Sequence, residues 1–260
     1  MAHIYDSITR RNLDFSGLKL NSSEIHSFGY KFYQNGIDIN MKGLQFDINM
    51  DIAKFAYLLA EWKEPQVINK PDMPYRTKNE KIYDLYIGNV TECVTNLYFK
   101  LLGVQQVRYY DLERKDNVYH KDTDYDLQLN DKKMSLKATP TTFIDDRFGG
   151  ADMMIKGLHG SNQDTSDRYY TQFLVTKADG RKPNMQDYNA LRENILSNSV
   201  NLYFVMLGGV VNYHNIGFKS LARQANRPAY LDTKIVFKPY FDTMNYVRAV
   251  LEDNGIYLGV

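Results

Sequence analysis

Two alternating runs on either side of a polar turn, within residues 122–139, constrain the fold of this chain more than any other feature. Polar and apolar residues alternate with a period of two before and after the turn, which predicts strand, turn and strand. The turn falls within residues 130–133, whose side chains tolerate tight turns. If the turn holds two or four residues, Asp126 lies across from Ser135 or Lys137 on the polar face of the hairpin.

A long helix is predicted for residues 79–102, because its apolar residues recur along one stripe at helical spacing. Gly103 then ends the helix. Glu92 lies away from the centre of this stripe, beside a second and weaker apolar strip that contains Leu85 and Phe99. A helix that is apolar on two sides is expected to be covered on both, so we expect Glu92 to be partly buried.

The order of the remaining elements predicts an α/β fold, with a mixed central sheet flanked by helices. We expect further helices at residues 50–63, 185–197, 216–224 and 241–254. We expect strands at residues 104–111, 169–176, 202–213 (with a bulge at Gly208-Gly209) and 233–240. A small hairpin is expected at residues 36–48 with its turn at Lys42-Gly43, and a loop at residues 140–160.

Residues 64–78 contain three prolines with charges between them and are the candidate boundary between two parts of the chain. Residues 1–75 are expected to form a small α+β N-terminal region. Residues 76–260 are expected to form the main α/β core.

Composition excludes little. The 260 residues carry a net charge of +1, so no global basic field indicates a nucleic-acid partner, although a local patch is compatible with this value.

The single cysteine, Cys93, rules out an internal disulfide, is expected to be a small buried hydrophobe, and fits the reducing cytoplasm. The longest apolar run, residues 203–211, is too short to cross a bilayer, so we expect no membrane association. The five histidines are scattered and lack the spacing of a zinc site.

The polar face of the predicted hairpin carries the parts of a metal-dependent phosphodiesterase. Mg²⁺ prefers hard oxygen ligands, commonly one or two carboxylates together with water and phosphate oxygens. Asp126, with Asp124 or another carboxylate, supplies such ligands. Lys137 is placed to orient an attacking water and to stabilise the scissile phosphate. The competing interpretation of Asp126 and Lys137 is a cross-strand salt bridge on an exposed sheet face.

These residues resemble the PD-(D/E)xK nuclease superfamily, which includes many restriction enzymes, repair nucleases and phage nucleases. The resemblance covers about residues 80–177: a helix carrying Glu92 and ending Leu-Leu-Gly, a strand, Asp-Tyr-Asp-Leu, a short turn, and a strand ending Ser-Leu-Lys-Ala-Thr. It implies a restriction-endonuclease-like fold in which Asp126 is the principal metal ligand and Lys137 the catalytic lysine. Glu92 then matches the acidic residue often found on the first core helix, and residues 169–176 form the core strand after the catalytic one.

The sequence departs from this pattern at Ser135, which occupies the position of the second acidic residue. Some members with serine here take the missing carboxylate from a later segment, so the resemblance leaves several candidates open. They are Asp124, Glu92, Asp145, Asp146 and Asp152.

An alternative register pairs Asp152 with Lys177 at the end of the next predicted strand, and it ranks second because its hairpin is longer and no second carboxylate lies near Lys177. Basic residues also gather in sequence around the proposed site, where they can meet phosphates. They are Arg108, Lys121, Lys132, Lys133, Arg147 and Lys156.

The resulting expectation is a Mg²⁺-dependent endonuclease, with Mn²⁺ as a substitute, that hydrolyses double-stranded DNA and works as a homodimer. Catalysis is assigned to Asp126, Lys137, Glu92 and Ser135, and metal binding to Asp126, Asp124, Glu92 and Asp152. The N-terminal region and the segment after Met185 would contact DNA or form the dimer interface. The competing hypothesis is a catalytically inactive protein that keeps the nuclease scaffold and binds DNA or a protein partner, and Ser135 is its main support.

Overall fold

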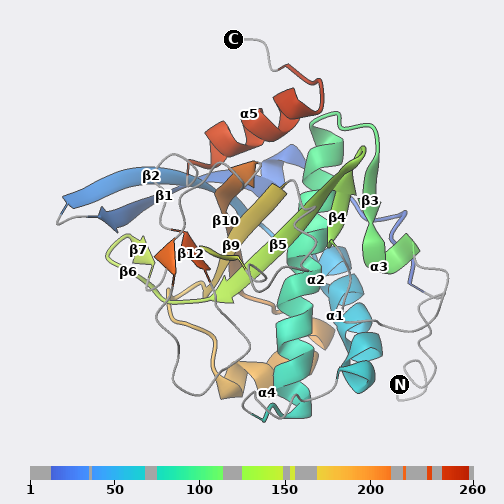
Figure 1. The fold of residues 1–260 in the computed structure, drawn as a ribbon. Coiled ribbons are helices and arrows are strands. Elements are labelled where there is room, and N and C mark those ends of the chain that lie inside the picture. The colour runs from blue at the N-terminus through green and yellow to red at the C-terminus, as the bar shows by residue number, and fades with distance from the viewer. Residues whose placement is uncertain are drawn as a thin grey trace.

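In the computed structural model, a nine-stranded mixed sheet flanked by helices forms the centre of the fold (Figure 1). The structure describes residues 13–34, 37–67, 75–113, 125–148, 153–155, 169–211, 219–220, 233–235 and 242–257. The strands of the sheet, in spatial order, are β3 (Val107–Tyr109), β4 (Leu127–Leu129), β5 (Lys132–Pro140), β9 (Tyr169–Lys177), β10 (Leu202–Val211), β2 (Ile37–Phe46), β1 (Ile25–Gln34), β7 (Arg147–Phe148) and β6 (Phe143–Ile144).

Most neighbouring strands in this sheet run antiparallel, and the pairs β5–β9 and β1–β7 are parallel. A second, three-stranded sheet contains β11 (Lys219–Ser220), β12 (Thr233–Ile235) and β8 (Met153–Ile155). The helices are α1 (Met50–Lys63), α2 (Lys78–Leu101), α3 (Tyr110–Glu113), α4 (Met185–Leu196) and α5 (Thr243–Asp253), with 3-10 turns η2 (Ser22–Glu24) and η3 (Glu64–Gln66). The mixed α/β class predicted from the sequence is therefore confirmed.

The predicted hairpin is formed by β4 and β5, and its turn holds the two residues Asn130 and Asp131. Asn130 adopts a φ of 53°, a left-handed conformation that asparagine tolerates well. Leu127 pairs with Met134, so the next position along places Asp126 opposite Ser135. This register is the one expected for a two-residue turn.

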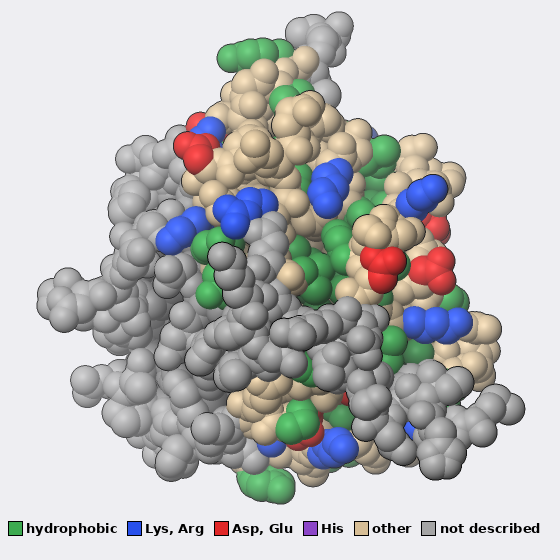
Figure 2. Space-filling view, turned by 90° about the vertical axis from the view of Figure 1, so that its right-hand side faces the viewer, with side chains coloured by type: hydrophobic (Ala, Val, Ile, Leu, Met, Phe, Trp, Pro, Cys, Tyr) green, Lys and Arg blue, Asp and Glu red, His purple; other side chains and the backbone are tan. Residues whose placement is uncertain are grey.

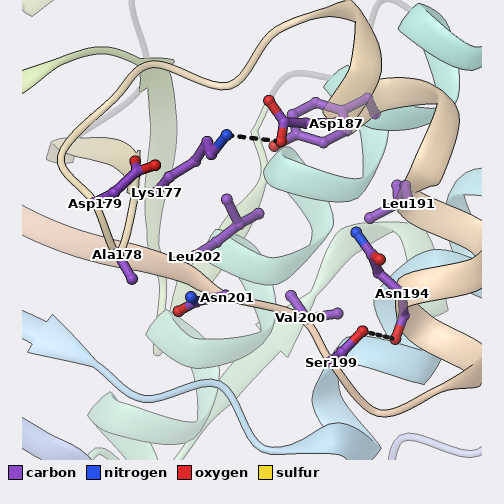
Figure 3. Close-up of a pocket in the computed structure, with 11 residues that line it drawn as sticks. Lys177, Ala178, Asp179, Asp187, Leu191, Asn194, Ser199, Val200, Asn201 and Leu202 are labelled. Carbon is purple, nitrogen blue, oxygen red and sulfur yellow. Dashed lines mark hydrogen bonds and ion pairs between the residues drawn. The ribbon is translucent and has the colours of Figure 1, made fainter.

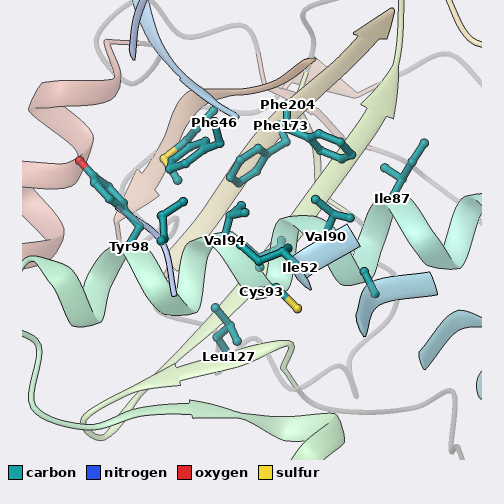
Figure 4. Packing of buried hydrophobic residues seen from close by; sticks show 14 of the residues in the cluster. Phe46, Ile52, Ile87, Val90, Cys93, Val94, Tyr98, Leu127, Phe173 and Phe204 are labelled. Carbon is teal, nitrogen blue, oxygen red and sulfur yellow. The ribbon is translucent and has the colours of Figure 1, made fainter. Parts of the chain in front are cut away.

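Helix α2 packs its apolar stripe against the sheet, where it contacts β3 and β5. Its N-terminus is closed by a capping box, in which Thr77 accepts from the backbone of Glu80 and Glu80 accepts from that of Thr77. Val90 and Val94 point from α2 toward Phe173 of β9 (Figure 4). Fully burying each large apolar side chain of this kind contributes roughly 1.5–3 kcal/mol. Cys93 lies in the same layer and is buried, as expected from the sequence.

Several predicted elements are confirmed. Helix α1 has the predicted bounds, α2, α4 and α5 differ from theirs by one or two residues, and β9 lies beside β5 as expected. The register of β10 against β9 shifts between Met206 and Gly208, which is the predicted bulge. A Cβ at Gly209 would stand 1.9 Å from the carbonyl oxygen of Tyr170, so the bulged strand has no room for a side chain there.

Other predictions were wrong in their details. Residues 37–46 form one continuous strand, β2, and do not turn at Lys42-Gly43. Strand β3 is shorter than predicted and is followed at once by α3. Lys219 and Ser220, predicted as helix, are strand, and the predicted loop at residues 140–160 contains β6, β7 and β8.

The N-terminal strands share the sheet of the main core. Strand β2 pairs with β10, with Phe46 opposite Phe204, and α1 packs against α2. A DNA-binding or dimerisation role for residues 1–75 stays a prediction. Within the described residues, no helix is both long enough and apolar enough to span a membrane.

Candidate active site

Three of the predicted catalytic residues are joined by hydrogen bonds at the open end of the β4–β5 hairpin. Asp126 Oδ2 accepts from the backbone N–H of Leu136 at 2.6 Å and from the hydroxyl of Ser135 at 3.4 Å. The Lys137 ammonium donates to Ser135 Oγ at 3.0 Å. Asp126 and Lys137 therefore meet through Ser135, and each of the three side chains has its position set by another.

Asp126 also lines a cavity of about 250 Å³ between the hairpin, α1 and α2. Glu92 of α2 lines the same cavity, so this predicted residue is brought near Asp126. Lys137 is linked to the cavity only through Ser135 and Asp126. The lining residues are Lys63, Val67, Arg76, Lys81, Asp84, Leu85, Gly88, Asn89, Glu92, Asp111 and Asp126.

The ammonium of Lys63, which is only 3% exposed, lies among the acidic groups of this cavity. It forms an ion pair with Asp111 Oδ2, donates to Asn89 Oδ1 at 2.6 Å, and lies 3.9 Å from Glu92 Oε2. The side-chain amide of Asn89 in turn donates to the carbonyl of Ala56 in α1 at 3.0 Å. The buried charge is thus held by two helices and by the segment that follows β3.

Glu92 is the most strongly perturbed acid of the cavity. Its pKa is raised to about 8: burial is the largest cause and repulsion by Asp111 and Asp126 adds to it, while the Lys63 ammonium acts in the opposite direction. Its Oε2 atom is buried and makes no hydrogen bond of good geometry within the described part of the chain. The buried hydroxyl of Tyr109 lies near enough to lower the pKa of Glu92 slightly, against the effect of burial. Perturbed carboxyls of this kind, in a cavity and beside a charge partner, are concentrated at functional sites.

Sequence reasoning missed Lys63 and Asp111, although each left a signal. Lys63 follows Leu59 and Ala60 by four and three positions, so it continues the buried stripe of α1 and requires a buried partner. Asp111 lies two positions after the buried Tyr109 and is itself buried. A charged residue on an apolar stripe is informative because unpaired charges are rarely buried.

The other candidate carboxylates do not join this site. Asp145 and Asp146 occupy the turn between β6 and β7, with φ of 51° and 60°. That hairpin lies at the opposite edge of the sheet from β3 and β4 (Figure 1). They therefore serve the turn, and Asp146 also lies 3.6 Å from Lys31. Asp124 and Asp152 lie outside the described residues.

The donor atoms of the cavity suit a hard divalent cation. Mg²⁺ prefers oxygen ligands, and the cavity offers carboxylate oxygens of Glu92, Asp111 and Asp126 and the amide oxygen of Asn89. Among the described residues, no group of three or more His, Cys, Asp or Glu side chains is arranged to hold a metal ion. The chemistry of the donors fits the ion, whereas the position of Lys63 opposes it.

The alternative register places its lysine in a different setting. Lys177, at the end of β9, pairs with Asp187 of α4 at 3.0 Å, in a smaller pocket of about 150 Å³ (Figure 3). Asp179, in the turn after β9, binds the Arg181 guanidinium at 2.8 Å, which lowers the pKa of Asp179. The acidic partner predicted for Lys177, Asp152, lies outside the described residues.

Basic side chains near the hairpin are spread out. Arg108 and Lys133 flank Gln128 on neighbouring strands, and Lys133 lies 5.6 Å from the ring centre of Tyr125. In Figure 2, Lys and Arg side chains are scattered over the described part of the face on the β3 side and do not form one patch. This distribution agrees with the small net charge of the chain.

Comparison of the chain with protein-family models, with curated proteins and with solved structures found no match.

Proposed function

We propose that this protein is a Mg²⁺-dependent endonuclease of the restriction or phage type, which hydrolyses phosphodiester bonds of DNA and also accepts Mn²⁺. The observation that carries the proposal is the hydrogen-bonded series Lys137–Ser135–Asp126, which ends at a cavity shared with Glu92. Convergence of a lysine and two carboxyls from three elements suits phosphodiester hydrolysis better than an exposed salt bridge, which would need only two.

In this proposal each residue has a distinct task. Lys137 orients the attacking water and stabilises the charge that develops on the phosphate, and Ser135 holds the ammonium in position. Asp126 and Glu92 would hold the ion, which when bound lowers the pKa of water and neutralises phosphate charge.

The mouth of the cavity supplies further charges for a DNA backbone. Arg76 and Lys81 line the cavity and form ion pairs with Asp84 at 2.9 Å and Glu64 at 3.5 Å. Exchange of these carboxylates for phosphates would position a duplex over Asp126. A homodimer, with one site for each strand of duplex DNA, and a location in the reducing cytoplasm complete the proposal.

A second function is favoured by two observations. Serine replaces a carboxylate at Ser135, and Lys63 neutralises part of the acidic cavity. Both are compatible with a protein that keeps a nuclease scaffold, has lost catalysis, and binds DNA or a protein partner.

Cleavage of DNA by the purified protein separates the two functions. Supercoiled plasmid and long linear duplex are incubated with the protein and Mg²⁺, Mn²⁺ or EDTA. We expect metal-dependent cutting that falls by about 100-fold or more in Asp126→Asn and in Lys137→Met. Lys177→Met, the matched change in the alternative register, is expected to cut like the wild type.

Full activity in both Asp126→Asn and Lys137→Met would contradict the assigned site, even if the protein is a nuclease. DNA binding without cutting under any metal would favour the inactive scaffold. Loss of activity in Lys177→Met alone would favour the alternative register.

A further inference from the structure

The surroundings of Lys63 are those of a bound cation. Oxygen atoms of Asn89 and Glu92 in α2 and of Asp111 in α3 lie around its ammonium. Carboxylate and amide oxygens of this kind are the ligands that a hard divalent ion prefers. The oxygen atoms around Lys63 Nζ are therefore of the type that such an ion takes as ligands.

The Lys63 ammonium does not form close contacts with all of the acidic oxygen atoms in the cavity. Besides Asp84, which pairs with Arg76, the carboxyl groups of Glu92, Asp111 and Asp126 line the cavity. Lys63 makes its closest contact with Asp111. At 3.9 Å, Glu92 Oε2 is too far from Lys63 Nζ for a hydrogen bond. That oxygen is fully buried and has no hydrogen bond to any described residue, so it retains a capacity that the ammonium does not use.

Asp111 lies beside Asp126, where the second acidic residue of the nuclease pattern, replaced by Ser135, would be needed. It follows β3, which pairs with β4, and the backbone N–H of the adjacent Tyr110 donates to the carbonyl of Asp126 at 3.3 Å. Asp111, in α3 directly after β3, and Asp126, directly before β4, therefore enter the cavity from the ends of two paired strands. Ser135, by contrast, is occupied by its contacts with Lys137 and Asp126.

We propose that Asp111 supplies the carboxylate absent at Ser135, and that Lys63 and a divalent cation are alternative occupants of the space between Glu92, Asp111 and Asp126. This inference rests on the proposed function in taking a divalent cation as the ligand. Lys63 holds the carboxylates together while the ion is absent and gives up its contacts when the ion binds. Its position in the last turn of α1 and its flexible four-carbon stem suit such a movement.

Calorimetric titration of the metal-free protein with Mn²⁺ tests the competition without any measurement of cleavage. Lys63→Met keeps the apolar stem and removes the charge, so we expect it to bind Mn²⁺ at least about tenfold more tightly than the wild type. Asp111→Asn should weaken binding at least about tenfold, and the gain should vanish in the double variant. Lys177→Met, a charge removed at a distant ion pair, should match the wild type within about twofold.

A folded Lys63→Met that binds Mn²⁺ no more tightly than the wild type would overturn the inference. So would an Asp111→Asn variant with unchanged affinity.

Brief acetylation of the wild-type protein, followed by mass spectrometry, decides the question even if Lys63→Met does not fold. Without divalent ions, Lys63 should be protected, whereas the exposed Lys54 on the same helix should react. At saturating Mn²⁺, modification of Lys63 should rise at least about fivefold, and that of Lys54 should stay constant. Continued protection of Lys63 at saturating Mn²⁺ would show that the ion binds elsewhere, and would overturn the inference.

The outcome is separable from that of the nuclease proposal. Tighter Mn²⁺ binding by Lys63→Met in a protein that never cuts DNA supports the competition and contradicts the nuclease. Metal-dependent cutting with unchanged Mn²⁺ affinity in Lys63→Met supports the nuclease and contradicts the competition.

Discussion

The protein places two lysine–carboxylate pairs at different depths, and their comparison explains why only one is a candidate for chemistry. Lys63 and Asp111 have side chains that are 3% and 11% exposed, and they share a cavity with three further carboxyls. Lys177 and Asp187 are 22% and 25% exposed and pair at 3.0 Å beside the smaller pocket. Lys63 and Asp111 interact with the other charges of their cavity with little screening, whereas water partly screens the interaction between Lys177 and Asp187.

The difference has a physical origin. Removal of one partner from a buried pair leaves an uncompensated charge in a medium of low dielectric constant. Removal of one partner from an exposed pair leaves a charge that water solvates. The same substitution at the two sites therefore measures how strongly the protein depends on each pair.

The largest effect is expected from matched lysine-to-methionine changes. Lys63→Met should lower the free energy of unfolding by about 3–5 kcal/mol in the absence of divalent ions, because Asp111 would lose its buried partner. Lys177→Met should lower it by only about 0–1 kcal/mol. Urea denaturation at neutral pH measures both. Equal losses at the two sites would contradict the difference in depth.

An intermediate effect is expected from the pH dependence of stability. The pKa of Glu92 in the folded protein is about 8, above its ordinary value of 4.5, because burial disfavours the charged form. Below pH 4.5 Glu92 is neutral in the folded and the unfolded protein, so its burial does not affect stability. Between pH 4.5 and 8 Glu92 ionises in the unfolded protein but not in the folded one, so the free energy of unfolding decreases as the pH rises through 8. Glu92→Gln should remove the decrease, which we expect to be on the order of 2 kcal/mol between pH 5 and 8.5.

Asp179, which lines the pocket beside Lys177 and Asp187, provides the control for the measurement of stability against pH. The pKa of Asp179 is lowered by Arg181, so Asp179 titrates below this pH window. Asp179→Asn should therefore leave the slope of stability between pH 5 and 8.5 unchanged. A wild-type protein whose stability does not change over this range would show that Glu92 is not perturbed as described.

The smallest effect is expected in the response to salt. A double-mutant cycle on Lys177 and Asp187 should give a coupling energy of about 0.2–1 kcal/mol, which falls as NaCl is raised toward 1 M. The same cycle on Lys63 and Asp111 should give a larger value that salt hardly changes, since ions do not enter the buried site. Equal salt dependence would remove the distinction between the two pairs.

Local patterns predicted those parts of the fold that a single element determines. The period of two in residues 125–137 was sufficient for the β4–β5 hairpin, and the stripe of α2 for its bounds within a residue. The prediction of a hairpin turn at Lys42-Gly43 was wrong because it relied on a residue pair that is typical of turns, whereas the pair lies within β2. Gly43 instead serves close packing, since a Cβ there would stand 2.9 Å from the carbonyl oxygen of Met206 in β10.

The site was predictable only in part, because its members come from elements whose contacts no local pattern reports. Asp126, Ser135 and Lys137 share one hairpin, so their spacing was enough to bring them together. Lys63 reaches Asn89 across 26 positions of sequence, and only the packing of α1 on α2 makes that contact. The second apolar strip beside Glu92 indicated that the residue is partly buried, without indicating a partner.

The pairing of β2 with β10 also has a consequence for folding during synthesis on the ribosome. Strand β2 ends at Phe46, whereas β10 begins at Leu202. At about 5–20 residues per second, the nascent chain carries β2 with one unpaired edge for on the order of ten seconds. During that interval the edge is open to other chains. Chaperone occupancy on stalled nascent chains should therefore drop once β10 has left the exit tunnel.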